Sequence, residues 1–375
     1  MRSKFENQRF SNCEFCAFWT KVQNFAGAKP PNNIYVILNI RERRDAPCGS
    51  IVIIMQINLK ETAEFLKTHD NYYILTHQNP DGDTMGSGFA LCYALRKIGK
   101  NANVLCSDEF PQKYRFMYSD YEPQKFSPDT IVAVDVADTK LLGSRLTQYA
   151  EYVDLCVDHH ISNTQYSEKL LVYPDASATC EVLYRVLSEM DVEMDTCIAQ
   201  CLYTGIATDT GCFKYGNTTR LAHLIAAKLM EYEVDIEQIN REMFDVKSKA
   251  RLMVEQYILS SMEYYMDDRC TIAAVTLDTI EETGLAQDDF EGIAGMTVQP
   301  EGVKIGVIIK ERDKGKFKVS MRSASEIDVS EICGRFGGGG HVKAAGCTLE
   351  GRLEDVKMEL LSAIAPVLGI DLWLA

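Results

Sequence analysis

Residues 72–83 have the sequence Tyr-Tyr-Ile-Leu-Thr-His-Gln-Asn-Pro-Asp-Gly-Asp. The run begins with aromatic, apolar and β-branched side chains, which predict a short buried strand over 72–76. It ends in His77, Asp81 and Asp83, whose side-chain types bind divalent cations. The stretch therefore predicts a strand that delivers metal-binding side chains at its carboxyl end.

The same pattern occurs twice more along the chain. The runs Thr130 to Val134 and Tyr152 to Val157 are short and rich in β-branched or aromatic residues, and acids or imidazoles follow them. A further acid, Asp209, follows a predicted helix. In an open α/β sheet, the loops that leave the carboxyl ends of the strands converge on one crevice. The side chains expected to meet there are His77, Asp81, Asp83, Asp135, His159 and Asp209.

This set of donors predicts a cation site rather than a chance cluster. A single Asp at a strand end is commonly a helix cap or turn former, and a single His is commonly structural. Four clustered carboxylates without a cation would repel one another. Two imidazoles and four carboxylates, with no cysteine, suit a pair of Mn²⁺ or Mg²⁺ ions better than zinc.

Two motifs carry a family resemblance. The triplet Asp158-His159-His160, with the acids described above, resembles the DHH phosphoesterase superfamily. The segment from Gly337 to Gly346 resembles the signature of the DHH-associated domain of its first subfamily. The resemblance covers about residues 57 to 370 and is strongest to the short bacterial branch that combines oligoribonuclease with 3′-phosphoadenosine-5′-phosphate phosphatase activity.

The resemblance implies a role for each residue of the first motif set. Asp158 would orient the adjacent imidazoles, with direct ligation left open, and His160 would face the substrate phosphate or leaving oxygen as a donor or general acid. Two cations about 3.5–4 Å apart would lower the pKa of a bridging water that attacks phosphorus. Mn²⁺ is expected, with Mg²⁺ and Co²⁺ as alternatives. One cation would be held by His77, Asp81 and Asp135, and the other by Asp83, Asp135, His159 and Asp209.

The C-terminal motif predicts substrate binding. Four successive glycines let backbone N–H groups approach an anion closely. By resemblance, the matching Arg and His contact the phosphate or base of a nucleotide, in a cleft between two domains that closes over a short substrate. The expected substrate-binding residues are Arg322, Ser323, Gly338, Gly339, Gly340 and His341.

The formal net charge of −15 excludes a broad duplex-binding surface, which needs a basic patch. It does not exclude a small nucleotide, because bound cations supply local positive charge. Segment 303–323 is an exception, since seven basic residues outnumber two acids there. Most of these basic residues are explained equally well in two ways, as the lysine edge of a solvated two-stranded ribbon or as a patch that steers phosphate. Only Arg322 stands out as a candidate for substrate binding.

Composition predicts a cytoplasmic enzyme. The 13 cysteines are an odd number and lie mostly within apolar runs, as expected in a reducing compartment. No run of about 18 apolar residues is present, so we expect no membrane span. The expected partners are short single-stranded RNA or small nucleotides, and a homodimer is an open alternative.

The chain is predicted to be an α/β protein with two domains. Alternating strands and helices over 55–234 predict a catalytic domain with a doubly wound, mostly parallel sheet. A helical connector over 235–265 and a smaller α/β domain over 266–375 follow. Residues 1–54 carry eight basic and four acidic residues and little periodicity. We expect them to be a poorly ordered extension or a mis-called start.

Individual elements follow from hydrophobic spacing. In the first domain, helices are expected over 60–69, 84–99, 177–190, 195–208 and 219–231. In the second domain, strands are expected over 270–277, 303–311 and 316–322, followed by the glycine run 337–340 and a helix over 353–368.

The sequence thus predicts a two-metal phosphoesterase, acting as an exonuclease on short oligoribonucleotides and as a phosphatase on adenosine 3′,5′-bisphosphate. A phosphodiesterase acting mainly on linear or cyclic dinucleotides (pApA or c-di-AMP) is one alternative. A nucleotide-sensing module without catalysis is another, which the complete donor set disfavours. The polarity of chain shortening stays open.

Overall fold

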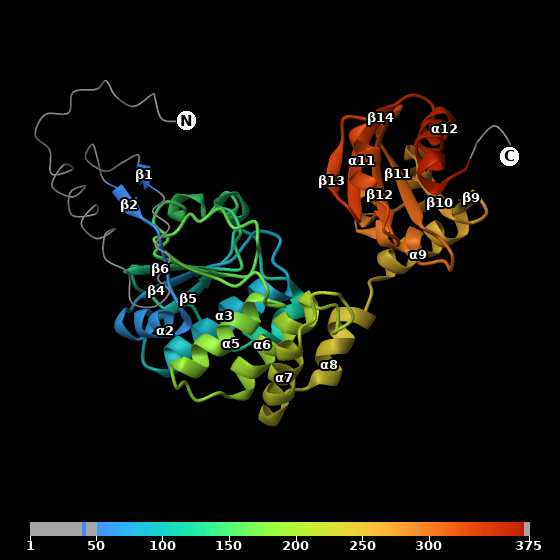
Figure 1. Ribbon diagram of the computed structural model, residues 1–375. Coiled ribbons are helices and arrows are strands. Elements are labelled where there is room, and N and C mark those ends of the chain that lie inside the picture. The colour runs from blue at the N-terminus through green and yellow to red at the C-terminus, as the bar shows by residue number, and fades with distance from the viewer. Residues whose placement is uncertain (1–39, 43–50, 291, 371–375) are drawn as a thin grey trace, which may run out of the picture. The chain divides into compact units, whose positions relative to one another are not determined.

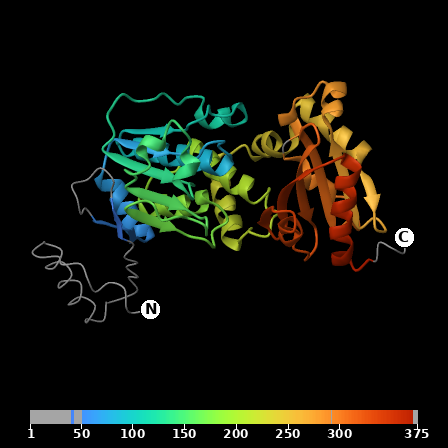
Figure 2. The ribbon, with the colours of Figure 1, turned by 90° about the horizontal axis from the view of Figure 1, so that it is seen from above.

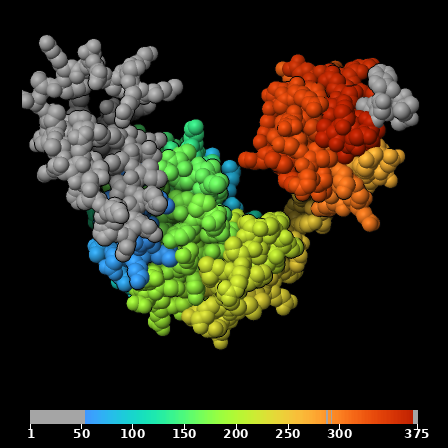
Figure 3. Space-filling model, in the orientation of Figure 1, coloured from blue at the N-terminus to red at the C-terminus, as the bar shows by residue number. Residues whose placement is uncertain are grey.

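The computed structural model describes residues 40–42, 51–290 and 292–370. The chain divides into two compact units, Met1–Asp245 and Val246–Ala375, which Figure 3 shows in space-filling form. Each unit has its own sheet (Figure 1) and its own hydrophobic core. The N-terminal extension predicted over 1–54 lies largely outside the described residues. Its described parts include β1 (Ile40–Glu42) and β2 (Ile51–Ile53), which pair antiparallel.

The first unit contains a six-stranded sheet in the order β3-β8-β7-β6-β4-β5, and every pairing is parallel. This confirms the parallel α/β prediction, although β5 and β8 were not predicted. The strands are β3 (Met55–Gln56), β4 (Tyr72–Leu75), β5 (Ala102–Leu105), β6 (Thr130–Val134), β7 (Leu155–Asp158) and β8 (Lys169–Val172).

Helices cover one face of this sheet (Figure 1). The central one, α3, is buried along most of its length and packs against α5 and α6. The opposite face packs against the segments that connect β6, β7 and β8. The α-helices are α2 (Leu59–Thr68), α3 (Gly82–Lys97), α4 (Arg115–Tyr118), α5 (Thr179–Glu189), α6 (Thr196–Asp209), α7 (Arg220–Leu229) and α8 (Ile236–Asn240). Short 3-10 helices are η1 (Gln112–Tyr114), η2 (Thr139–Leu142), η3 (Thr147–Tyr149) and η4 (Met230–Tyr232).

The packing of α3 against α6 depends on small residues. A Cβ at Gly86 of α3 would lie 2.4 Å from the carbonyl oxygen of Cys201. A Cβ at Gly205 of α6 would lie 2.8 Å from Asp83 Oδ1. The two helices can therefore approach closely only because these side chains are absent, and the approach brings Asp83 near the end of α6.

The connector predicted over 235–265 is not one continuous helix, although its helical spacing of apolar residues indicated one. It comprises α8, a π-helical turn η5 (Arg241–Asp245), α9 (Lys249–Ser261) and the strand β9 (Glu263–Tyr265). After α9 the backbone becomes extended at Met262, and β9 pairs antiparallel with β10. Strand pairing therefore overrides helical spacing at the end of this segment.

The second unit contains a mixed six-stranded sheet in the order β13-β14-β12-β11-β10-β9, in which only β10 and β11 are parallel. Its strands are β9, β10 (Cys270–Val275), β11 (Ile305–Asp313), β12 (Lys316–Ser323), β13 (Gly339–His341) and β14 (Ala344–Glu350). Its further helices are α10 (Leu277–Thr283), η6 (Gln287–Phe290), η7 (Ile293–Val298), α11 (Val329–Gly334), α12 (Leu353–Ile364) and η8 (Ala365–Leu368).

Both faces of the second sheet are packed in part. Helices α11 and α12 cover one face, and Figure 2 shows the red helix α12 alongside the strands. On the other face, α9, η6 and η7 pack against β10 and β11. Among the helices of the described ranges, none combines the length and apolar character that crossing a membrane requires.

Candidate active site

The order of the first sheet explains why the predicted donors meet. Strand β6 lies between β4 and β7, so Asp135, which follows β6, lies between His77 and His159. The chain runs from β4 outward to β5 and then returns to β6 on the other side of β4. This is the topological switch point at which α/β sheets form their sites. Asp135 is thus the central residue of the cluster.

The first group of donors consists of His77, Asp81 and Asp135, whose ligand atoms lie within 4.8 Å of one another. His77 Nε2 is 3.6 Å from Asp81 Oδ1 and 3.7 Å from Asp135 Oδ2. His77 Nδ1 lies 2.7 Å from the carbonyl oxygen of Gln78, to which it can only donate. In the neutral ring this leaves the Nε2 lone pair available for a cation.

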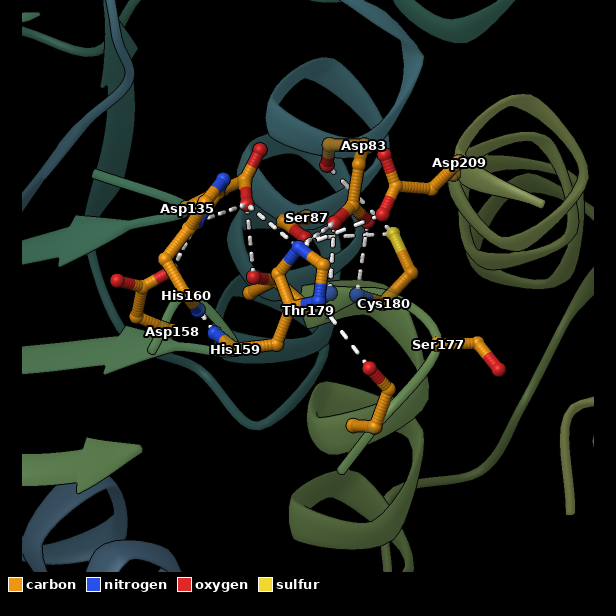
Figure 4. Close-up of polar contacts among 12 residues, drawn as sticks. Asp83, Ser87, Asp135, Asp158, His159, His160, Ser177, Thr179, Cys180 and Asp209 are labelled. Atoms are coloured by element: carbon orange, nitrogen blue, oxygen red, sulfur yellow. Dashed lines mark hydrogen bonds and ion pairs between the residues drawn. The ribbon is translucent and has the colours of Figure 1, made fainter. Parts of the chain in front are cut away.

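The second group consists of Asp83, His159 and Asp209, again within 4.8 Å (Figure 4). His159 Nε2 is 3.3 Å from Asp209 Oδ2, 3.9 Å from Asp83 Oδ2 and 3.8 Å from Asp135 Oδ1. His159 Nδ1 lies 3.2 Å from the carbonyl oxygen of Ala176, so its Nε2 is the nitrogen left available for a cation. Asp135 contacts both groups.

The electrostatics of the cluster favour a cation. Asp83 and Asp135 are 1% and 2% exposed, and burial raises the pKa of each carboxyl well above its usual range. Nearby acids raise the pKa further, Asp135 acting on Asp83 and Asp81 acting on Asp135. Buried carboxylates in such proximity are costly unless a positive charge neutralises them. The oxygen and imidazole donors therefore fit hard divalent cations.

Asp158 differs from Asp83 and Asp135 because its hydrogen bonds, from a histidine ring and an amide side chain among others, keep it ionised despite its burial. Oδ1 accepts from the backbone N–H of His159 at 2.8 Å and from His160 Nδ1 at 2.8 Å, and Oδ2 accepts from Asn163 Nδ2 at 2.6 Å. Burial opposes ionisation, yet the bonds from His160 and Asn163 hold the pKa of Asp158 below its usual value. In turn, Asp158 raises the pKa of His160, whose side chain is 43% exposed.

Two backbone amides and one hydroxyl also donate hydrogen bonds to acids of the cluster, and the sequence analysis did not identify them. Thr179 N–H donates to Asp83 Oδ2 at 2.6 Å, and Cys180 N–H donates to Asp83 Oδ1 at 2.9 Å. The hydroxyl of Thr179 donates to Asp135 Oδ1 at 2.9 Å (Figure 4). Residue Ala178 at the start of α5 offers no capping side chain, so Asp83 caps α5 from another helix. No sequence signal pointed to this cap, because the helix was predicted to begin at Ser177, a residue type that commonly caps helices itself.

In the second unit, strand register places two predicted substrate-binding residues in one row. Arg322 of β12 pairs with Ala344 of β14, which pairs with His341 of β13. Directly opposed residues of antiparallel strands project from the same face, so Arg322 and His341 flank a small side chain. Ser323 alternates to the opposite face, where its hydroxyl donates to the carbonyl oxygen of Ser325 at 3.0 Å.

The predicted glycines have two different roles. A Cβ at Gly338 would lie 2.2 Å from the carbonyl oxygen of Gly346, and one at Gly340 would lie 2.5 Å from that of Ala344. These two glycines let the segment approach β14. A Cβ at Gly339 would meet nothing within 4 Å, so this glycine borders open space.

Comparison with known families matches both units. Residues 71–206 match the N-terminal domain of the DHH family, and residues 268–369 match the DHHA1 domain. The bifunctional oligoribonuclease and PAP phosphatase NrnA of Thermus thermophilus is 33% identical over 302 residues, covering 78% of this chain and 89% of that protein. The protein of the same name from Bacillus subtilis is 22% identical over 295 residues, covering 77% and 92%.

The fold has a counterpart among solved structures. The crystal structure of an exopolyphosphatase-related protein from Bacteroides fragilis aligns with a TM-score of 0.70 at 24% identity, covering 81% of this chain and 94% of that one. The order of the two matched domains and the extent of the Thermus alignment lead to one conclusion: the chain belongs to the DHH family and carries a DHHA1 domain after its DHH domain.

Proposed function

We propose that this protein is a metal-dependent phosphoesterase that hydrolyses short oligoribonucleotides and adenosine 3′,5′-bisphosphate. The observation that carries the proposal is that two groups of potential metal ligands adjoin, the first containing Asp135 and the second contacting Asp135 through His159. The names of the Thermus and Bacillus relatives support the substrate class. Hydrolysis of a phosphoester needs positive charge near the phosphoryl oxygens, and the donor groups are suited to hold it.

The proposed ligand sets are those expected from the sequence. His77, Asp81 and Asp135 would hold one cation, and Asp83, Asp135, His159 and Asp209 the other. When bound, the cations supply a Lewis acid and lower the pKa of a coordinated water. Mn²⁺ is the proposed ion, with Mg²⁺ and Co²⁺ as alternatives, because the donors are oxygen and imidazole without thiolate.

His160 is proposed to act on the substrate directly. Its Nδ1 is hydrogen-bonded to Asp158, which fixes the ring and favours the protonated form. The proton on Nε2 can then be donated to a phosphoryl oxygen or to the leaving oxygen. Asp158 is proposed to orient the two neighbouring histidines, because its Oδ1 accepts from His160 Nδ1 and from the backbone N–H of His159.

The DHHA1 domain is proposed to bind the nucleotide. Arg322 and His341 project from one face on either side of Ala344, and Gly339 leaves open space beside them. A guanidinium binds phosphate through paired hydrogen bonds, which suits Arg322 to this role. The net charge of −15 supports small or single-stranded substrates over duplexes.

Two further properties stay predictions from the sequence. A cytoplasmic location is consistent with the ten cysteines in the described ranges, all of which are free thiols. Homodimer formation is the other, and size-exclusion chromatography with light scattering would test it.

Product analysis would test the proposed function. Purified protein with Mn²⁺ would be incubated with labelled RNA of two, five and many more nucleotides, adenosine 3′,5′-bisphosphate, and linear and cyclic di-adenylate. We expect mononucleotides from the short RNA and AMP from the bisphosphate, with no activity after chelation or in Asp135→Ala. Preferential turnover of a dinucleotide would favour the dinucleotide phosphodiesterase. Nucleotide binding without turnover under any metal would favour the sensing module.

A further inference from the structure

Two cysteines of the DHHA1 domain lie in contact next to the glycine-rich segment. Cys333 is in the last turn of α11, and Cys347 is in β14. Both side chains belong to the hydrophobic core of the second unit, and they are 0% and 7% exposed. The two thiols are hydrogen-bonded to each other. Helix α11 and strand β14 therefore meet at a pair of sulfur atoms.

Gly338 lies against both cysteines. Its N–H donates to the carbonyl oxygen of Cys333 at 3.0 Å. A Cβ at Gly338 would lie 2.5 Å from Cys347 Cβ, so only a glycine lets the segment come this close. Strand register pairs Cys347 with Val319, which is buried on the face that α11 covers. The Cys347 side chain therefore projects toward α11, and a change at the thiol pair reaches Gly338 directly.

The two thiols differ in how readily they ionise. The hydrogen bond from Cys333 lowers the pKa of the Cys347 thiol below its ordinary value. The same bond, together with burial, raises the pKa of the Cys333 thiol. Because the thiolate is the reactive form of cysteine, Cys347 is the nucleophile of the pair and Cys333 stays protonated beside it.

Cys347 is also the cysteine that an oxidant can reach. It borders a groove of about 800 Å³ on this domain, whereas Cys333 is completely buried behind it. A hydroperoxide as small as hydrogen peroxide can enter such a groove. A thiol of lowered pKa with a second thiol beside it is the arrangement that favours reversible oxidation, because the second thiol resolves the first oxidation product.

We propose that Cys333 and Cys347 are a site of oxidation by hydroperoxides, which closes them into a disulfide and weakens nucleotide binding by the DHHA1 domain. The Cys347 thiolate attacks one peroxide oxygen, and the O–O bond breaks. The sulfur becomes a sulfenic acid, and the departing oxygen takes up a proton as water or an alcohol. The sulfur of Cys333 then attacks the sulfur of Cys347, and the S–O bond breaks. Hydroxide leaves with the proton of Cys333 as water, so two thiols lose two electrons and one peroxide gains them.

The effect on binding follows from the position of Gly338. A disulfide draws the two sulfur atoms to about 2.05 Å, which is closer than a hydrogen bond between thiols allows. The end of α11 and β14 must then approach each other, and Gly338, which contacts both cysteines, is displaced. His341 follows in the same segment. The binding effect rests on the proposed function, in which His341 contacts the nucleotide, but formation of the disulfide does not.

Peptide mapping tests the disulfide in the full-length protein without any assay of activity. Trypsin places the two cysteines in separate peptides, 323–335 and 344–352, each of which contains one cysteine. After treatment with hydrogen peroxide we expect these two peptides to be joined, with the loss of two hydrogens, and to separate again in dithiothreitol. Cys270 of the same core is the internal control, because burial raises its pKa to about 12 and it is expected to stay reduced.

Single variants identify the order of the steps. In Cys333→Ala the sulfenic acid of Cys347 has no partner to resolve it, so we expect dimedone to label peptide 344–352. In Cys347→Ala we expect no label on peptide 323–335. The melting temperature of each reduced variant checks that its fold is intact.

Kinetics test the effect on binding. The oxidised protein would be desalted and assayed with Mn²⁺ on short RNA and on bis-p-nitrophenyl phosphate. We expect KM for short RNA to rise about 10-fold, because a charge-assisted hydrogen bond that is lengthened by about 1 Å is largely lost. Turnover of the small ester should not change. Dithiothreitol should restore KM, which separates the disulfide from methionine sulfoxide, since that product needs an enzyme for its reduction.

Each step of the proposal can fail separately. Absence of the joined peptides, or oxidation of Cys270 to the same extent, would overturn the thiol pair. Joined peptides with an unchanged KM for short RNA would overturn the effect on binding, as would an equal rise in KM in peroxide-treated Cys333→Ala and Cys347→Ala. Joined peptides in a protein without activity on any nucleotide would instead count against the proposed function.

Discussion

Replacement of Thr179 by valine isolates one hydrogen bond at the centre of the proposed metal site. The hydroxyl of Thr179 donates to Asp135 Oδ1 at 2.9 Å, and both residues are almost fully buried. Valine keeps the branched shape and the backbone N–H that donates to Asp83, so only the hydroxyl is lost. Serine at the same position keeps the hydroxyl and is the matched control.

The expected magnitude follows from the burial of this bond. A hydrogen bond to a charged group contributes about 1.5–3 kcal/mol, which corresponds to about a 10- to 150-fold change in an equilibrium constant. The donor also lowers the pKa of Asp135, so its loss makes a proton compete more strongly with the cation. Loss of a group that orients a ligand typically costs about 10- to 100-fold in metal affinity.

Isothermal titration with Mn²⁺ measures the effect directly. We expect Thr179→Val to weaken binding about 10- to 100-fold and Thr179→Ser to stay close to the wild type. The melting temperature of each metal-free variant checks that the fold is intact. Wild-type Mn²⁺ affinity in the valine variant, or equal losses in valine and serine, would refute the positioning role of this hydroxyl.

Further predictions concern the two sites and the N-terminal boundary. Arg322→Ala or His341→Ala should raise KM for short RNA about 10- to 150-fold while leaving hydrolysis of bis-p-nitrophenyl phosphate nearly unchanged. Equal losses of activity on both substrates would show that these residues do not act through the nucleotide. Asp135→Ala should abolish hydrolysis and lower metal occupancy, whereas His160→Ala should lower kcat with both metals still bound. Calorimetry measured beside kinetics distinguishes the two variants. The pKa values of Asp83 and Asp135 are raised in the folded protein, so their contribution to the stability of the metal-free form is present in acid and lost as pH rises through those pKa values. The increase in melting temperature on adding Mn²⁺ should therefore be larger at alkaline than at mildly acid pH. Removal of residues 1–50 should leave kcat and KM unchanged, whereas removal through Ile54, a core residue that is 5% exposed, should lower the melting temperature.

The sequence predicted which donor side chains lie close together, because the strands that carry them are buried on both faces. The apolar runs that became β4, β6 and β7 contain few polar interruptions, so their carboxyl ends, and the acids that follow them, were visible. Thr179 could not be found this way, because its role arises only when α5 meets the acids of other elements.

Edge positions explain most of the elements that were missed. Strand β5 lies at one edge of the first sheet, and β8 pairs at its other side with the two-residue strand β3, so neither has a long apolar signature. Strand β14 begins within the glycine-containing motif, whose composition hides its alternation. The helical spacing of apolar residues over 235–265 continues into β9. This segment becomes a strand because it pairs with β10.

The cap that Asp83 provides for α5 has a consequence for how variants of this enzyme are interpreted. The same two oxygens that are proposed to bind a cation also accept the first free N–H groups of α5, a helix with no cap of its own. Asp83 variants are therefore expected to loosen the first turn of that helix while they remove a proposed ligand, and a loss of turnover in them mixes two causes. Within the described part of the chain the Asp209 carboxylate caps no other helix and faces His159, so its replacement tests the proposed ligand role more directly. For mutagenesis in this family, equivalent acids of one cluster are not equivalent probes.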